Sequence, residues 1–99
     1  MTQINFERTS GLVGRPLRYT VNLDNLPEDE AQILQRLIDE ANFFELPSNL
    51  RGNATPDEFQ YRLTVQNGNQ EHTVQASDTT MPRSLVPLIK ELTILKMLR

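Results

Sequence analysis

Apolar and polar residues alternate in two segments near the start of the chain, and each alternation predicts a β-strand. Residues 3–7 place Ile4 and Phe6 on one face. Residues 16–23 repeat the pattern, with four apolar side chains on one face: Leu17, Tyr19, Val21 and Leu23. The segment between them, residues 9–16, contains two glycines and closes with a proline. This composition predicts a loop that tolerates positive φ angles and has a stiff exit.

A helical repeat follows the second strand. Pro27, followed by three acidic residues, is a helix-start signal, because proline suits the first turn and carboxylates complement the positive end of the helix dipole. Apolar side chains then recur at helical spacing: Leu34, Leu37, Ile38, Ala41 and Phe44. This stripe assigns Phe44 to the core and Phe43 to a position under the next loop. Pro47 ends the helix, and residues 48–57 are predicted to be a loop.

Residues 59–76 carry the clearest local pattern, that of a β-hairpin. Apolar and polar residues alternate on both sides of Asn67-Gly68, a dipeptide typical of a two-residue type I′ turn. Such a turn sets the register. The predicted opposing pairs are Gln66 with Asn69, Leu63 with His72, Tyr61 with Val74, and Phe59 with Ala76. The inner face is then apolar apart from the histidine, and the polar outer face lies in water.

A second helix is predicted over residues 82–98. Its apolar side chains fall on one side: Leu85, Leu88, Ile89, Leu92 and Leu95. Pro82 suits the first turn, whereas Pro87 removes a backbone hydrogen bond and predicts a bend or a delayed start. Further apolar residues widen the stripe near the end: Ile94, Met97 and Leu98. We expect them to be buried in the monomer, with a dimer contact as the alternative.

The predicted elements follow the order β-β-α-β-β-α, which indicates an α+β domain. In this fold two helices pack on one face of a four-stranded antiparallel sheet. The 99 residues, 37% of them hydrophobic, fit one domain over residues 1–99, because two separate cores would each be too small.

Composition narrows the classes of partner. The net charge of −3 disfavours binding to nucleic acid, and no cluster of Lys and Arg would hold the chain on an anionic membrane. The chain has no cysteine, which excludes disulfides, thiol catalysis and thiolate metal sites. The first eight residues lack the apolar core of a signal peptide, and no apolar run approaches the ~20 residues that span a bilayer. We therefore expect a cytoplasmic protein.

His72, the only histidine, is the one candidate for a general base or a metal ligand. A catalytic histidine needs an orienting carboxylate or a nucleophile, and a zinc site needs three or four ligands. The sequence offers neither at a recognisable spacing, so we interpret His72 as a structural, partly buried residue. The acidic run Glu28, Asp29 and Glu30 is explained by its place at a helix start. No catalytic residue, metal site or cofactor is predicted.

The segment Gly11-Leu12-Val13-Gly14-Arg15 is the strongest candidate for a binding site. It is not a phosphate cradle, because no helix start follows and the Lys-Ser/Thr pair of a nucleotide loop is absent. A tight connector has no packing need for Leu12 and Val13, whereas exposed apolar residues on loops often anchor partners. Two interpretations stay open here: a simple strand connector, and a contact for a protein partner.

Short patterns also follow one another in a fixed order along the chain. The opening combines Phe6-Glu7-Arg8, Gly11, Gly14 and Pro16-Leu17-Arg18. The first helix and its exit combine Leu26-Pro27, Glu30-Ala31 and Phe43-Phe44-Glu45-Leu46-Pro47. Phe59-Gln60-Tyr61, His72-Thr73-Val74, Pro82, Leu85 and Pro87-Leu88 complete the series. The ordered set covers about residues 4–95 and resembles the emfourin family, small inhibitors of thermolysin-like metalloproteases.

This resemblance implies a non-enzymatic, proteinaceous inhibitor that acts on the catalytic cleft of a thermolysin-like zinc metalloprotease. The glycine-flanked loop of residues 9–16 would enter the cleft. Leu12 or Val13 would fill the pocket for a bulky aliphatic residue, flanked by three further contact residues: Gly11, Gly14 and Arg15. Residues 48–57 would form a second contact, through Leu50, Arg51 and Asn53. The first loop departs from the family pattern, which bears on the target more than on the fold.

The alternative to this reading is a non-enzymatic interaction module, or a subunit of an intracellular complex. Such a module would use its helical face or a sheet edge. For the inhibitor, as for the module, we expect a monomer or a weak dimer. An enzyme with unfamiliar chemistry would have to build its site from Tyr61, His72 and carboxylates.

Overall fold

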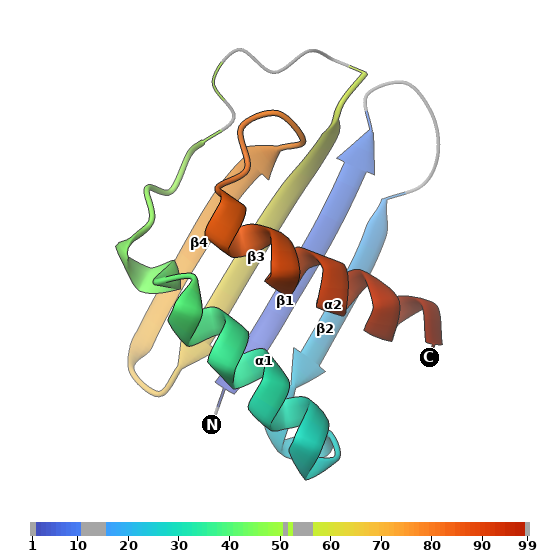
Figure 1. Cartoon of the computed structure of the whole chain (residues 1–99), viewed down its shortest axis with the longest axis vertical. Helices are drawn as coiled ribbons and strands as arrows, with labels where there is room; N and C mark the ends of the chain where they lie inside the picture. Colours follow the sequence, from blue (N-terminus) through green and yellow to red (C-terminus); the bar gives the residue numbers. More distant parts are fainter. Residues whose placement is uncertain (1, 11–15, 51, 53–56, 99) are drawn as a thin grey trace.

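Four antiparallel strands form one sheet, and two helices cover one of its faces (Figure 1). The computed structural model describes residues 2–10, 16–50, 52 and 57–98. The strands and helices are β1 Thr2–Ser10, β2 Leu17–Asn22, α1 Glu28–Glu40, β3 Phe59–Asn67, β4 Gln70–Ser77 and α2 Val86–Leu98. Three short 3-10 helices are η1 Leu23–Asn25, η2 Phe43–Glu45 and η3 Arg83–Leu85. The predicted order β-β-α-β-β-α and the α+β class are confirmed.

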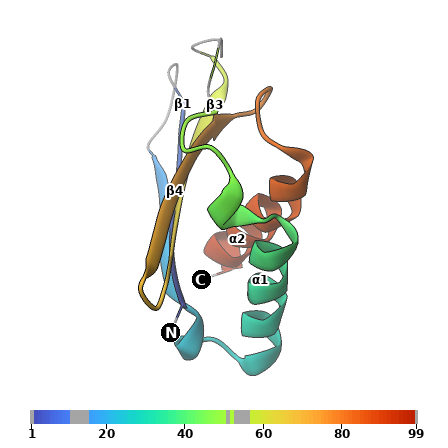
Figure 2. The same cartoon turned by 90° about the vertical axis from the view of Figure 1, so that its left-hand side faces the viewer.

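The long strand β1 lies in the interior of the sheet, whose order is β2-β1-β3-β4. β1 pairs with β2 from Gln3 opposite Asn22 to Arg8 opposite Leu17, and it pairs with β3 along its whole length. Two segments that are distant in sequence, β1 and β3, therefore meet in the centre of the sheet. Seen from the side, both helices stack against a single face and leave the other face bare (Figure 2).

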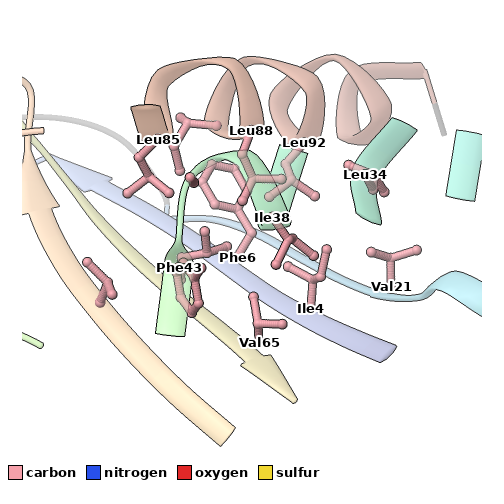
Figure 3. Close-up of a cluster of buried hydrophobic side chains, with 14 of the residues drawn as sticks. Ile4, Phe6, Val21, Leu34, Ile38, Phe43, Val65, Leu85, Leu88 and Leu92 are labelled. Atoms are coloured by element: carbon pink, nitrogen blue, oxygen red, sulfur yellow. The ribbon is translucent and has the colours of Figure 1, made fainter. Parts of the chain in front are cut away.

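The hydrophobic core fills the space between the sheet and the helices (Figure 3). Alternate residues of the strands point into it, because successive side chains of a strand face opposite sides. The largest fully buried apolar side chains come from all layers: Ile4, Leu34, Ile38, Phe43, Leu63, Val65, Val74, Leu85, Leu88 and Leu92. Among the described residues, no helix is long and apolar enough to cross a membrane.

The second helix begins later than its apolar pattern suggests. Residues 83–85 form the 3-10 turn η3, and α2 begins at Val86, so Pro87 lies in its first turn, where no backbone donor is needed. The delayed start predicted from Pro87 is confirmed. The predicted burial of the last apolar residues is wrong: their exposed fractions are 50% for Ile94 and 76% for both Met97 and Leu98. These three side chains lie on the part of the helix surface that does not face the sheet.

The hairpin turn lies one residue later in the sequence than predicted, which moves each cross-strand partner by two residues. β3 and β4 stay paired up to Asn67 opposite Gln70, so the two loop residues are Gly68 and Asn69. Gly68 has φ 62° while Asn69 keeps a negative φ, as in a type II′ turn rather than the predicted type I′. The observed pairs are Leu63 with Val74, Val65 with His72 and Tyr61 with Ala76. The shift spans two positions, so the assignment of residues to faces survives.

The two phenylalanines after α1 differ from the prediction, because Phe43 rather than Phe44 lies in the core. α1 ends at Glu40, and Asn42 takes a left-handed conformation with φ 50°. This turn breaks the helical phase, so Phe43 enters the core with an exposed fraction of 1%, and Phe44 packs against it from a partly buried position. The prediction was wrong because it extended the helical repeat through a residue type that often adopts the left-handed region.

Candidate functional site

Three connections leave the sheet at the same end, which we call the loop end (Figure 1). They are the β1–β2 connection, the segment between η2 and β3, and the β4–η3 connection. The predicted binding residues Gly11, Leu12, Val13, Gly14 and Arg15 belong to the first. They lie outside the described residues, as do Arg51 and Asn53 of the second.

Leu50 is the one predicted contact residue that the structure describes. Its backbone N–H donates to the carbonyl of Gln75 at 2.7 Å, and the N–H of Gln75 donates to the carbonyl of Ser48 at 2.8 Å. The segment around Asn49 thus lies along the outer edge of β4 as a short parallel bridge. The Leu50 side chain is partly buried against the core. Its role as a partner contact stays a prediction.

Arginine and aromatic side chains gather where β1 and β3 reach the loop end. The Arg8 guanidinium lies over the Phe59 ring, 4.6 Å from its centroid, an arrangement that favours a cation–π interaction. The Tyr61 ring stacks on Phe6, with ring centroids 6.4 Å apart. Phe59 was expected on the inner face, and it shares that face with Tyr61, but it is 41% exposed because it lies near the end of the sheet.

Asp78, the first residue after β4, links this cluster to the β4–η3 connection. One carboxylate oxygen accepts the Tyr61 hydroxyl at 2.9 Å, and the other accepts the backbone N–H of Phe59 at 3.2 Å. The backbone N–H of Asp78 donates in turn to the carbonyl of Phe59 at 3.3 Å. Burial raises the pKa of Tyr61 to about 12, helped by the hydrogen bond and the negative charge of Asp78, while Arg8 lowers it.

The two residues after Asp78 lie against the second connection, Thr79 at its β3 end and Thr80 near its interior. Glu58 accepts hydrogen bonds from the backbone N–H of Thr79 at 3.0 Å and from its hydroxyl at 2.7 Å. Thr80 closes the turn on the buried Ser77, whose N–H donates to the Thr80 hydroxyl at 2.9 Å. A Cβ placed on Gly52 would lie 3.8 Å from the Thr80 methyl group, so Gly52 comes close to this turn.

His72 lies away from the loop end and has structural partners. Its Nε2 is 2.6 Å from the carbonyl oxygen of Leu46, and because a carbonyl only accepts, Nε2 carries the proton. Its ring packs near Phe43 and Phe44. The bond joins β4 to the exit of η2, and the side chain is partly buried. Within residues 2–10, 16–50, 52 and 57–98, no group of three or more His, Cys, Asp or Glu could hold a metal ion.

The bare face of the sheet is polar, as predicted. Glu7 and Arg18 form an ion pair at 2.9 Å, with the arginine side chain 73% exposed. Arg62 lies opposite Glu7 on the neighbouring strand β3. A shallow hollow of about 270 Å³ lies among these side chains, open to solvent. These residues do not indicate a particular ligand, because the carboxylate of Glu7, between Arg18 and Arg62, already forms an ion pair.

Sequence reasoning named the loops but missed the residues that hold their bases: Arg8, Glu58, Tyr61, Asp78 and Thr79. They come from three separate stretches of the chain, at residues 8, 58–61 and 78–79, and the strand register brings these stretches together. One available signal was Asp78-Thr79-Thr80, three turn-forming residues directly after a strand. Asp and Thr in such a position often hydrogen-bond nearby backbone groups.

Comparison with known proteins gives two matches. The sequence model described as Emfourin matches residues 6–93. Among solved structures, emfourin from Serratia proteamaculans, described as an M4 family peptidase inhibitor, matches with a TM-score of 0.53 and 18% sequence identity. The alignment covers 91% of this chain and 87% of that one. At this identity the structural match shows a shared fold. No curated protein sequence matches the chain significantly.

Proposed function

This chain belongs to the emfourin family, and from that premise we propose that it is a non-enzymatic, proteinaceous inhibitor of a thermolysin-like zinc metalloprotease. The family match over residues 6–93 is the observation that carries the proposal. The fold shared with an M4 family peptidase inhibitor supports it.

The proposed contact is the loop end, with residues 9–16 entering the catalytic cleft of the protease. Two features support this choice. Residues 11–15 carry Leu12 and Val13 between two glycines, and they connect Ser10 of β1 to the start of β2. Both strands are held in the sheet up to this connection, Arg8 opposite Leu17 and Ser10 opposite Phe59. A loop with fixed ends loses less conformational entropy on binding.

The second connection supplies a further proposed contact through Leu50, Arg51 and Asn53. Its described ends lie beside the β4–η3 turn, so this connection and the first one leave the same end of the sheet (Figure 1). A partner that covers one connection would therefore reach the other. We propose that the protein works as a monomer in this complex, in the cytoplasm, with one copy for each protease molecule.

The direct test titrates a purified M4 family peptidase with the purified chain and follows cleavage of a peptide substrate. The expected result is a loss of activity that is complete near one inhibitor per protease. Unchanged activity across several M4 peptidases would refute the proposal. That outcome would favour the alternative, an interaction module that binds another protein.

The double variant Leu12→Gly, Val13→Gly tests which loop enters the cleft. Removing an apolar anchor costs about 1–3 kcal/mol, so the inhibition constant should rise at least ~tenfold. A matched control is Met97→Gly, Leu98→Gly, which removes two exposed apolar side chains from the end of α2, away from the loop end. It should leave the inhibition constant unchanged. If the control weakens inhibition and the loop variant does not, the contact lies on α2 instead.

A further inference from the structure

We propose that the turn Asp78-Thr79-Thr80, called here the 78–80 turn, is the positioning element of the inhibitory surface, with Asp78 as its main residue. The inference rests on the proposed function, because it assigns a role within that same surface. The 78–80 turn belongs to neither predicted binding loop. Its side chains instead hold the described residues at which the loops join the sheet.

Asp78 fixes the start of β3. Its two carboxylate oxygens accept from two different donors of that strand, the Phe59 N–H at 3.2 Å and the Tyr61 hydroxyl at 2.9 Å. With its own N–H on the Phe59 carbonyl, Asp78 extends the β3–β4 ladder by one position. A side chain with two hydrogen-bonding atoms is needed for this geometry, and alanine has none.

Thr79 and Thr80 lie against two parts of the second connection. Thr79 donates twice to Glu58, the residue that precedes β3. The methyl group of Thr80 lies close to Gly52, in the interior of the same segment, where an added Cβ would be 3.8 Å away. The hydroxyl of Thr80 also accepts from the buried Ser77 N–H, which fixes the turn to the end of β4. The 78–80 turn therefore binds the β3 end of the second connection at Glu58 and lies close to its interior at Gly52.

The first connection is tied to the same turn through Phe59. Asp78 binds the backbone of Phe59, and the Phe59 ring lies under the Arg8 guanidinium at 4.6 Å. Phe59 also pairs with Ser10, the last residue of β1 before the first connection. Loss of the Asp78 contacts should therefore loosen the residues at which both connections join the sheet, Ser10 and Glu58, while the core and the hairpin stay intact. Loosening raises the entropy lost on binding and speeds dissociation.

The experiment compares Asp78→Ala with two milder variants. Asp78→Ala should raise the inhibition constant against an M4 peptidase about tenfold, mainly through faster dissociation, as the loss of one or two net hydrogen bonds would produce. Asp78→Asn should stay within about threefold of the parent, because its oxygen can accept from Phe59 and its NH₂ can donate to the Tyr61 hydroxyl. Thr79→Val removes only the hydroxyl bond to Glu58 and should raise the constant roughly threefold.

Thr73→Val is the matched control. It removes a hydroxyl pair between the same two strands, Thr64 and Thr73 at 2.8 Å, away from the loop end. The melting temperature is measured for every variant. Thr73→Val should lower it without changing inhibition. If Asp78→Ala inhibits like the parent, or if Thr73→Val loses as much inhibition as Asp78→Ala, the positioning role is refuted.

Amide exchange of the free protein tests the same claim without a protease. Asp78→Ala should speed exchange at Ser10 and Gly52 relative to the parent, and Thr73→Val should not. Unchanged exchange at both residues would overturn the proposal even if no M4 peptidase were inhibited, so the two proposals can fail separately. If Asp78→Ala does not fold, Thr79→Val and Tyr61→Phe carry both measurements, with the same direction of change expected.

Discussion

The two ends of the sheet are built on different principles. At the hairpin end, the backbone ladder of β3 and β4 continues to Asn67 and Gln70, and a two-residue loop closes it with Gly68 at φ 62°. At the loop end, the backbone ladder ends near Asp78, and side-chain hydrogen bonds connect the neighbouring segments. There Asp78 reaches across to β3 and Thr79 reaches Glu58, in contacts that lie at the surface.

This difference separates what keeps the protein folded from what shapes the proposed binding surface. A backbone turn needs one suitable residue and tolerates most other changes near it. A set of exposed side-chain hydrogen bonds contributes less to stability, because water competes for each partner, but it decides where the connecting segments start and stop. Substitutions at the loop end should therefore change binding more than stability, and substitutions at the hairpin end should do the reverse.

The largest effect on stability is expected in the hydrophobic core, which supports both ends of the sheet. Leu92 of α2 is fully buried between that helix and the sheet (Figure 3). Leu92→Ala leaves a cavity and should lower the free energy of unfolding by about 2–5 kcal/mol. Both ends should loosen together, as read from amide exchange at Ser10 and at Gly68. Faster exchange at one end alone would mean that the two ends do not share one core.

A smaller effect is expected for Gly68→Ala at the hairpin end. A Cβ on Gly68 meets no atom within 4 Å, so the cost is the left-handed backbone alone, about 1 kcal/mol. Urea denaturation should show this loss, and the inhibition constant should stay at the parent value. Weaker inhibition by this variant would break the comparison, since the hairpin end would then contribute to binding.

The smallest effect on stability at neutral pH concerns Tyr61 at the loop end, because its phenol ionises only at high pH. Its folded-state pKa of about 12 lies above the ordinary 10.0, so folding favours the protonated phenol. That contribution is present in full below pH 10 and is lost as the pH rises through 12. Absorbance of tyrosinate should show one tyrosine titrating late, and Tyr61→Phe should remove it.

Asp78→Ala offers a control for the same titration. The late midpoint should move partly toward 10, because burial, the main cause of the shift, remains after the hydrogen bond and the charge of Asp78 are gone. An unchanged midpoint in that variant would mean that Asp78 does not contact the Tyr61 hydroxyl in solution.

Most of the fold could be predicted because it follows from periodic patterns. The strand alternation, the stripe of α1 and the effect of Pro87 each depend on residues close together in sequence. The errors arose where one residue reset a pattern. Asn42 took a left-handed conformation and moved Phe43, rather than Phe44, into the core. The hairpin turn fell on Gly68 and Asn69, because either dipeptide around Gly68 suits a two-residue loop.

The candidate site was less predictable than the fold. The glycine-flanked loop stood out by composition, but the contacts between Asp78 and Tyr61 join residues 17 positions apart. They depend on the register of β3 against β4, which was predicted two residues wrong. The exposed end of α2 was missed for a related reason: hydrophobicity alone cannot say which side of a wide apolar stripe faces the sheet.

The most direct test of the central claim maps where a protease covers this protein. Amide exchange of the chain is measured free and bound to a catalytically inactive M4 peptidase. We predict new protection at the loop end, at Ser10, Gly52 and Thr79, and none at the hairpin residues Gly68 and Asn69. Protection at the hairpin turn or over the end of α2, with the loop end unchanged, would contradict the account.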